Sequence, residues 1–356
     1  MKPFDLPVIP NSPIRQSSET VEGMFQLKKF GNFGFIQNVA FDETLISFDR
    51  NYQNDQSNSS VFRQHMGDVY SLIKSNCHEG SKLVEVGCGK GAFLEIVKAD
   101  GYFNYAGYDA AYEGSDDKIK ARYLNEKDRI KANIVVLRHS LDYIKAPHTF
   151  LKMLGKIFGK EALIFIEVPQ FDWIDKHKVL FDFTYERPSY FSTESLCSLF
   201  TDVKEYGDFF GGQYQYCLAR LGSSNNDKWH GFNLPENWSD FNFDMYLQSF
   251  SESIDFLNQK QRIWVWGGGN KGVLFIKHLS DVSPNIFQKV TGVVDIDEKK
   301  QGLYTPSTNL PIISPRQMFT QCEDSDFVLV VNPNYLNEVR NNLEKNVPFP
   351  INSGTI

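Results

Sequence analysis

Short apolar runs alternate with amphipathic stretches through the middle of the chain. Between Ser60 and Lys74 the apolar positions share one helical face, which predicts a helix ahead of the first strand of a sheet. Further helices are predicted near residues 91–100, 147–158 and 193–200, and strands near residues 82–87, 104–109, 133–138 and 162–168. Strands that alternate with helices favour a parallel sheet with both faces covered.

A hairpin and a polar linker follow this first α/β segment. Two strand-like runs, at residues 203–207 and 214–221, flank Gly211–Gly212 and predict an antiparallel pair that closes the sheet. The stretch Gly222–Asp227 is small and polar, which is typical of a domain boundary. A helix is then predicted from about Trp238 to Gln261.

The last part of the chain repeats the order of strand, glycine turn and helix. A strand at residues 262–266 leads into glycines, a second at residues 291–294 ends at Asp295, and a third covers residues 326–331. The predicted divisions are an N-terminal arm (1–50), an α/β domain (51–222), a linker with a helix (223–262) and a smaller α/β domain (263–356).

The first fifty residues lack a long periodic element. Prolines at positions 3, 7, 10 and 13 predict an extended arm, and Gly31–Gly34 predicts a turn between short strands. Such an arm either packs over the next domain or forms a lid over an active site, and the pattern leaves both alternatives open.

Composition narrows the class of protein. The chain has 356 residues, enough for two domains with substantial cores, and its net charge of −7 argues against a nucleic-acid partner. It has no apolar run long enough for a membrane span and no signal-peptide core, so we expect a cytoplasmic protein without a membrane partner. The five cysteines form no Cys-x-x-Cys pair, so neither a disulfide framework nor a metal site is predicted.

The clearest candidate site is a glycine turn in the run from Leu83 to Leu94. Its glycines permit positive φ and let a ligand approach the backbone, and the following helix N-terminus favours an anionic group. About twenty residues later a strand-like run ends at Asp109, whose carboxylate could accept both hydroxyls of a ribose.

The pattern E-V-G-C-G-K-G followed by G-Y-D resembles the S-adenosylmethionine (SAM) site of class I methyltransferases more than a nicotinamide site. In such a site Glu85 would hold the cofactor by its amino end, and Gly87 and Gly89 would admit it. Asp109 would accept the ribose hydroxyls and Ala110 would lie near the adenine.

The second glycine turn has three interpretations, and the simplest is that its glycines are purely structural. Gly267, Gly269, Asn270 and Lys271 could cradle a diphosphate as part of a substrate site. Alternatively, Asp295 would fit the ribose of a nicotinamide dinucleotide, which would make the last domain an oxidoreductase.

Several separated segments resemble the nucleotide-sugar C-methyltransferase family, from about residue 50 to residue 345. They are Glu85–Phe93, Leu137–Ile144, Ile166–Pro169, Tyr185–Phe191, Trp266–Gly272, Asp295, Lys300–Pro306 and Leu310–Pro315. The resemblance implies a Rossmann-like class I methyltransferase domain followed by a smaller Rossmann-like α/β domain. It also implies SAM as cofactor and a nucleotide-linked sugar as substrate, with the C-terminal domain helping to enclose that sugar.

The chain departs from this family at two places. The N-terminal zinc-binding cysteines are missing, which predicts a degenerate, zinc-free arm. The family's histidine that is suspected as a base is also missing, because Tyr185, Glu186, Arg187 and Pro188 stand in that neighbourhood. Similarly, Leu141–Ile144 replaces a family segment that often contains a histidine.

The candidate catalytic residues are Glu186, His139 and Tyr185. His139 ends a strand at the carboxyl edge of the sheet, and Glu186 could act as a base if burial raises its pKa. Arg187 could contact substrate phosphates, and Tyr185 and Tyr190 could donate to substrate oxygens. A supporting histidine, an Arg–Glu pair and packed tyrosines are the alternatives.

The sequence therefore predicts a SAM-dependent methyltransferase that acts on a sugar in polysaccharide or natural-product biosynthesis. C-methylation follows from the resemblance, and the missing histidine leaves O-methylation open. The alternatives are a non-catalytic protein that binds SAM or a nucleotide sugar, and an NAD-dependent oxidoreductase. The oligomeric state is not predicted.

Overall fold

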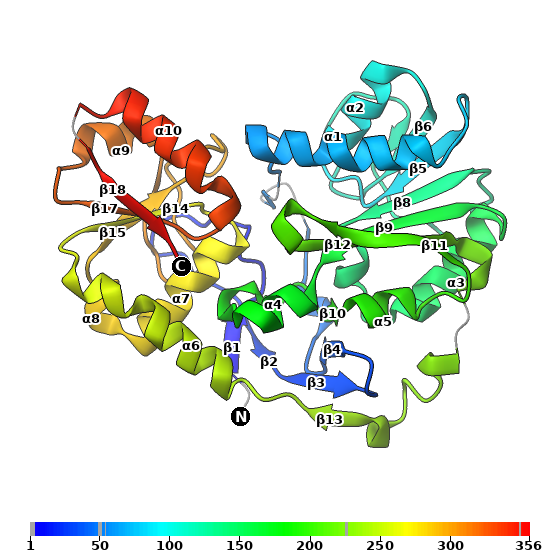
Figure 1. Ribbon diagram of the computed structural model, residues 1–356, viewed down its shortest axis with the longest axis horizontal. Helices are drawn as coiled ribbons and strands as arrows, with labels where there is room; N and C mark the ends of the chain where they lie inside the picture. The colour runs from blue at the N-terminus through cyan, green and yellow to red at the C-terminus, as the bar shows by residue number, and fades with distance from the viewer. Residues whose placement is uncertain (1–3, 49–51, 54, 225–226, 349) are drawn as a thin grey trace.

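The computed structural model describes residues 4–48, 52–53, 55–224, 227–348 and 350–356. Two α/β domains lie next to each other, and strands of the N-terminal segment run beneath the first of them in the view of Figure 1. Within the described ranges, no helix is both long and apolar enough to cross a membrane.

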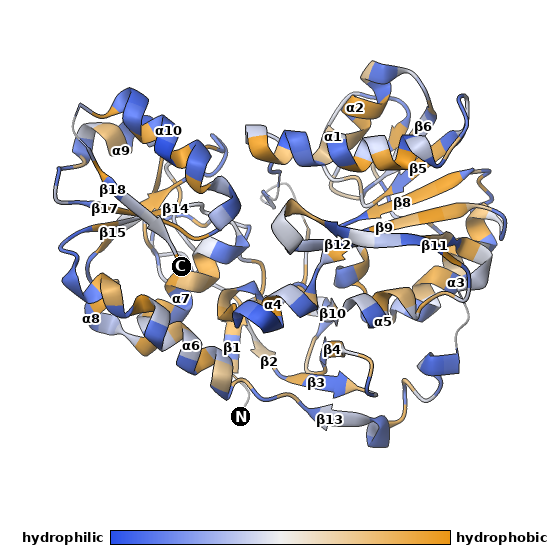
Figure 2. Ribbon diagram, viewed as in Figure 1, coloured by the Kyte–Doolittle hydropathy of each residue, from blue (hydrophilic) through white to orange (hydrophobic). Residues whose placement is uncertain are grey.

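The first domain is built on a seven-stranded sheet. Its order is β11-β12-β9-β8-β5-β6-β7, with β5 to β9 parallel and β12 antiparallel between β9 and β11. The strands are β5 Lys82–Val86, β6 Asn104–Tyr108, β7 Ile119–Lys120, β8 Ile134–Arg138, β9 Leu163–Pro169, β11 Val203–Phe209 and β12 Tyr214–Arg220. The central strands β8 and β9 are strongly hydrophobic in Figure 2, as expected for strands covered on both faces.

Four helices of this domain form where the periodicity predicted them: α1 Ser60–Ser75, α2 Ala92–Asp100, α3 Pro147–Phe158 and α5 Thr193–Cys197. The predicted helix at residues 193–200 thus ends three residues early. A fifth helix, α4 Phe171–His177, was not predicted. The predicted hairpin and the other strands of this domain are confirmed.

The second domain has a five-stranded parallel sheet in the order β16-β15-β14-β17-β18. Its strands are β14 Ile263–Trp266, β15 Val290–Val294, β16 Ile312–Ile313, β17 Phe327–Val330 and β18 Asn352–Thr355, and its helices are α7 Asn270–Val282, α8 Pro284–Phe287, α9 Pro315–Gln321 and α10 Leu336–Asn346. The prediction of two Rossmann-like α/β domains is therefore confirmed.

The N-terminal segment forms sheets instead of a free arm. β1 Phe4–Pro7 pairs with β2 Glu22–Phe25, and the turn predicted at residues 31–34 joins β3 Leu27–Phe30 to β4 Phe35–Asn38. β4 also pairs with β10 Ser189–Phe191 of the first domain. The segment is thus integrated into the fold through backbone hydrogen bonds.

The helix predicted from Trp238 is wrong at its start. Residues Trp238–Asp240 form β13, which pairs with β3, and the helix α6 covers only Asp244–Ile254. The Trp238 ring packs 5.1 Å from Phe30, so this tertiary contact outweighs the local helical pattern. Short 3-10 helices complete the chain at η1 Glu43–Leu45, η2 Leu141–Tyr143, η3 Leu180–Asp182, η4 Phe210–Gly212, η5 Leu221–Ser223, η6 Asp227–Trp229, η7 Pro235–Asn237, η8 Asp255–Gln259 and η9 Pro333–Tyr335.

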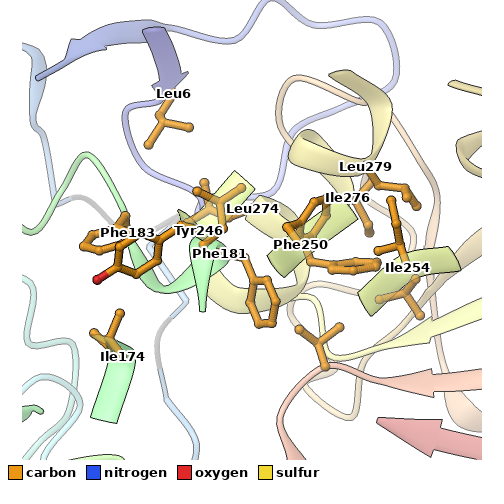
Figure 3. Packing of buried hydrophobic residues seen from close by; sticks show 14 of the residues in the cluster. Leu6, Ile174, Phe181, Phe183, Tyr246, Phe250, Ile254, Leu274, Ile276 and Leu279 are labelled. Atoms are coloured by element: carbon orange, nitrogen blue, oxygen red, sulfur yellow. The ribbon is translucent and has the colours of Figure 1, made fainter. Parts of the chain in front are cut away.

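A large apolar cluster joins the two domains. Figure 3 shows Phe181 of η3 and Phe250 of α6 among side chains from α7, and Leu6 of β1 belongs to the same cluster. The Phe181 ring lies edge-on to Phe275 of α7, with centroids 5.7 Å apart. Because this contact is apolar and buried, it fixes one side of the boundary between the domains.

Candidate active site

One large cavity lies between the carboxyl ends of the two sheets. Its volume is about 670 Å³. It is lined by the glycine turns after β5 and β14, the ends of β6, β8, β15 and β17, and residues of the N-terminal segment. Ligands of α/β proteins bind at this edge, where side chains and backbone amides of several strands converge.

The first glycine turn has the geometry that the sequence predicted. Gly87 and Gly89 have φ values of 77° and 55°, which L side chains rarely adopt, and a Cβ on Gly87 would collide with Ser140 Oγ. Asp109 fastens the turn, because its carboxylate accepts hydrogen bonds from the Gly89 and Ala111 amides, each at 2.8 Å. Ala110 is exposed and Ala111 lines the cavity in its place.

Two buried charges at the strand ends next to this turn lack part of their hydrogen bonding. Glu85 Oε2 and Arg138 Nη2 have no hydrogen-bond partner among the described residues. Burial raises the pKa of Glu85 to about 8, against the opposing charge of Arg138. Arg138 Nε donates to Glu167 at 2.9 Å, and its guanidinium lies 5.0 Å from the Phe93 ring centroid.

These residues fit SAM. The amino acid part of SAM carries an ammonium and a carboxylate, which are complementary to the free atoms of Glu85 and Arg138. The open glycine turn and Asp109 suit the ribose end. Arg138 was missed in the sequence, where the arginine at the end of an otherwise apolar strand was the available signal.

His139 lies at the cavity wall beside a buried carboxylate. Its backbone has a φ of 48°, its ring centroid lies 4.5 Å from that of Tyr214, and its Nε2 is 3.6 Å from Glu167 Oε2. Burial lowers the pKa of His139 to about 3, so the ring is neutral near pH 7. A neutral imidazole with such a low pKa is a weak base, and this disfavours His139 as the principal proton acceptor.

His65, His139 and Glu167 each offer one metal-ligand atom, and these atoms lie within 4.8 Å of one another. However, Arg138 already donates to one oxygen of Glu167, and His65 Nε2 lies 2.6 Å from the other. The carboxylate is therefore occupied by side chains of the protein, and we interpret the group as a buried charge cluster that orients His139.

Glu186 is the meeting point of three parts of the chain. Its Oε1 accepts hydrogen bonds from Tyr143 OH at 3.2 Å, Tyr52 OH at 3.4 Å and Asn270 Nδ2. The two tyrosine hydroxyls lie 3.0 Å apart. Tyr52 comes from the stretch before α1, Tyr143 from η2 and Asn270 from the start of α7.

Glu186 lies behind the cavity wall, because its three partners line the cavity and Glu186 itself does not. It is 1% exposed, and burial raises its pKa to about 7, with the hydrogen bond from Asn270 acting in the opposite direction. A carboxyl with this pKa can take or release a proton near neutral pH. Tyr52 and Tyr143 are the residues that could pass this proton to a ligand in the cavity.

Arg187 and Lys271 line the cavity as predicted, but both are held by Asp182. Arg187 Nη2 donates to the Asp182 carbonyl at 2.8 Å, and Arg187 Nε has no partner among the described residues. Lys271 Nζ donates to Asp182 Oδ2 at 2.8 Å and to Gln213 Oε1 at 3.1 Å.

Tyr185 and Tyr190 are not brought into the cavity. The Tyr185 hydroxyl accepts from the Asp42 amide at 2.9 Å, and the Tyr190 hydroxyl bonds to both backbone groups of Thr184. Both rings are buried in the apolar cluster between the domains. Their positions correct the expectation that these hydroxyls touch the substrate, because their hydrogen-bonding capacity is used by the backbone.

The second glycine turn also lies at the cavity, with Gly267, Gly269, Asn270 and Lys271 in its wall. Gly267 has a φ of 110°, and the Gly268 amide donates to Asp295 Oδ2 at 2.6 Å. Lys300 lies 3.6 Å from the same carboxylate oxygen and donates to the Gly268 carbonyl. A buried lysine of the protein thus occupies the neighbourhood of Asp295.

A set of polar contacts joins the two domains at the cavity, and we call it the polar rim. We define it by Asn332, η9 and α10 of the second domain and their partners in the first. Glu338 accepts hydrogen bonds from Ser59 Oγ at 2.6 Å and from the Ser60 amide at 3.0 Å. Further rim contacts join Tyr335 to Gln56, Asn334 to the Phe210 carbonyl, and Asn332 to Gln213.

Two family models match the chain. A model described as a methyltransferase domain matches residues 60–203, and one described as the C-methyltransferase C-terminal domain matches residues 231–348. A search of curated proteins found no significant match. The two matched ranges fall on the two sheets that face the cavity.

Solved structures resemble less than half of this chain. The plantazolicin methyltransferase BpumL, solved with S-adenosylhomocysteine (SAH), is 14% identical with a TM-score of 0.36, covering 48% of this chain and 87% of that chain. The YcgJ protein from Bacillus subtilis is 10% identical (TM-score 0.33, 41% and 70% covered), and the mitomycin 7-O-methyltransferase MmcR is 11% identical (TM-score 0.35, 45% and 54% covered). These identities and TM-scores are low, so the assignment of this chain to the methyltransferases rests on the two family models.

Proposed function

We propose that this chain, a class I SAM-dependent methyltransferase with a C-methyltransferase C-terminal domain, methylates a nucleotide-linked sugar in polysaccharide or natural-product biosynthesis in the cytoplasm. The sugar is supported by the resemblance of separated segments on both domains to nucleotide-sugar C-methyltransferases. It is also supported by a cavity that extends from one glycine turn to the other, with space for a second ligand beside the cofactor.

The observation that carries the catalytic part is the convergence of Tyr52, Tyr143 and Asn270 on Glu186. SAM, when bound, supplies an electrophilic methyl group. The acceptor atom must lose a proton, and Tyr143 lines the cavity while its hydroxyl donates to Glu186. Tyr143 can therefore take the acceptor's proton as its own proton passes to the carboxylate of Glu186.

Tyr143 and Glu186 also support C-methylation. That reaction removes a weakly acidic proton next to a carbonyl, so it needs a competent base. Arg187 lines the cavity, and its Nε, which has no partner among the residues that the structure covers, can donate a hydrogen bond to the oxygen that becomes negatively charged. We keep C-methylation as the proposal, and O-methylation is the outcome that would replace it.

The first test combines product analysis with one isosteric substitution. Incubation with isotopically labelled SAM and a panel of nucleotide sugars should give a labelled product, and fragmentation by mass spectrometry shows whether the methyl is on carbon or oxygen. Glu186→Gln should lower kcat by about 100-fold or more, because it removes the final proton acceptor. Affinity for SAH, measured by calorimetry, should stay within about twofold of the native value, because Glu186 does not line the cavity.

The pH dependence gives a second readout. The native kcat should rise with pH through about 7, where Glu186 loses its proton, and the Glu186→Gln variant should lack this step. Tyr185→Phe is a matched control that removes a hydroxyl from the neighbouring residue outside the cavity. Native turnover in Glu186→Gln would exclude this acid–base assignment, and the absence of any methylated sugar would exclude the proposed substrate class.

A further inference from the structure

We propose that Asp142 binds two neighbouring hydroxyl groups of the acceptor, so that the acceptor is a ring with a free vicinal diol beside the methylated atom. This inference rests on the proposed function and specifies its substrate class. It gives Asp142, to which the sequence analysis assigned no role, the task of binding the acceptor.

Asp142 is a buried carboxylate at the cavity, and the part of the chain that the structure describes gives it no hydrogen-bond donor. It lies in η2, is 2% exposed and lines the cavity. Neither of its side-chain oxygens has a hydrogen-bond partner among the described residues. A buried carboxylate without hydrogen bonds is costly in free energy, so a ligand that donates to both oxygens would be bound strongly.

No cation that the structure describes in the cavity wall lies within ion-pair distance of Asp142, and each of them lies within that distance of another carboxylate. The pairs are Lys90–Glu113 at 2.9 Å, Arg138–Glu167 at 2.9 Å, Arg187–Asp182 at 3.9 Å, Lys271–Asp182 at 2.8 Å and Lys300–Asp295 at 3.6 Å. Burial raises the pKa of Asp142 to about 6, with the charge of Arg187 acting in the opposite direction. The site therefore requires hydrogen-bond donors from the ligand.

The place of Asp142 in the chain puts this anchor next to the chemistry. Tyr143, which donates to Glu186, is the following residue, and Ser140, which packs against the first glycine turn, is two residues earlier. A sugar held by Asp142 would therefore lie in the cavity that Tyr143 and the first glycine turn also line. The two acceptor oxygens of one carboxylate match two adjacent ring hydroxyls.

The cofactor's ammonium is the competing ligand for Asp142. Glu85 is better placed for it, because Glu85 lies beside the glycine turn and has its own unpartnered oxygen. An amino group on the acceptor is the other competitor, since an ammonium would also satisfy the carboxylate. Both competitors are distinguished by the experiment below.

The test measures binding of defined sugar probes to SAH-loaded protein by ligand-observed NMR. The probes are methyl α-D-glucopyranoside, its four monodeoxy analogues and the corresponding 2-amino sugar. The native protein should bind at least one deoxy analogue about tenfold more weakly than the parent, as expected for a lost hydrogen bond to a charged group. Asp142→Asn should bind the parent and that analogue equally, and should keep native SAH affinity.

Asp55→Asn is the matched control, since Asp55 also lines the cavity but accepts a hydrogen bond from the Ser57 amide. It should retain the native preference among probes. Asp142→Ser provides a second variant if Asp142→Asn melts at a much lower temperature. Either variant suffices for the comparison.

Equal binding of all deoxy analogues by the native protein would overturn the proposal, as would native discrimination in both Asp142 variants or failure of every probe to bind. A strong preference for the amino sugar would replace the diol with a cation, and weakened SAH binding alone would assign Asp142 to the cofactor. If a methylated sugar forms in the product assay but Asp142→Asn leaves its KM unchanged, this inference fails while the proposed function stands.

Discussion

The same kind of hydrogen bond stabilises two glycine turns, Gly87–Gly91 after β5 and Gly267–Gly269 after β14. In each, an aspartate at the end of the neighbouring strand accepts a hydrogen bond from a glycine amide of the turn. The distances are 2.8 Å from Gly89 to Asp109 and 2.6 Å from Gly268 to Asp295. Both turns lie at the same cavity.

The charges around the turns differ. The first is preceded by Glu85, a buried carboxylate with an unpartnered oxygen, whereas Val265 occupies the corresponding position before the second. The aspartate of the second turn has Lys300 3.6 Å away. The two turns thus share a backbone arrangement, and the side chains around each turn decide which ligand charge it can accept. The first turn suits a cationic cofactor. At the second turn, the charge of Asp295 is neutralised by Lys300 of the protein itself.

The strongest test of this difference places a methyl group on each turn. Gly87→Ala should weaken SAH binding by about 100-fold or more, because the residue has positive φ and its new Cβ meets Ser140. Gly267→Ala introduces the same backbone strain where a Cβ meets nothing within 4 Å, so SAH affinity should change by less than about threefold. Calorimetric titration gives both values, and equal losses would mean that the second turn also holds the cofactor.

A smaller effect is expected from neutralising each aspartate. Asp109→Asn should weaken SAH binding by about 10-fold, as for the loss of a charged acceptor of ribose hydroxyls. Asp295→Asn should leave SAH affinity unchanged and lower the melting temperature, because buried Lys300 loses its partner. Adding NAD or NADP should not raise the melting temperature of the native protein, and a rise that Asp295→Asn abolishes would support the oxidoreductase alternative instead.

A third prediction concerns the proton on Glu85. Burial raises the pKa of Glu85 from 4.5 to about 8, so the free protein loses stability as pH rises through this interval. A bound ammonium favours the ionised carboxylate, and cofactor binding should therefore release a proton. SAH affinity should increase by up to about tenfold per pH unit below pH 8, and Glu85→Gln should remove most of this slope. An identical slope in the variant would show that Glu85 does not face the ammonium.

Much of the fold was predictable because local signals agreed with tertiary packing. The helix at Ser60–Lys74 and the strand at residues 134–138 have periodic or continuous apolar positions, and the structure buries those positions. The strand at Trp238–Asp240 was not predictable, because it depends on pairing with β3, more than two hundred residues earlier in the chain.

The candidate site also has a part that could be predicted from the sequence and a part that could not. Glycine spacing and Asp109 are encoded within some twenty-five residues, so the cofactor turn could be recognised from sequence. The Glu186 cluster needs Tyr52, Tyr143 and Asn270 from three distant segments, and no local pattern records that they meet. Tyr185 belongs to the same family-like segment as Glu186, but the two residues lie in a turn closed by the Arg187 amide and the Thr184 carbonyl, and the Tyr185 hydroxyl bonds to the backbone of Asp42.

The polar rim has a consequence for the timing of turnover. An apolar cluster resists opening as a unit, whereas hydrogen bonds such as those from Ser59 and Ser60 to Glu338 can each be exchanged for water at about 0.5–1.5 kcal/mol. We therefore expect the two domains to rotate about the apolar cluster between them, so that the polar rim opens only for short periods. The residence time of a finished product would then be set by side chains at the rim, so mutation there could tune release while the acid–base groups stay unchanged.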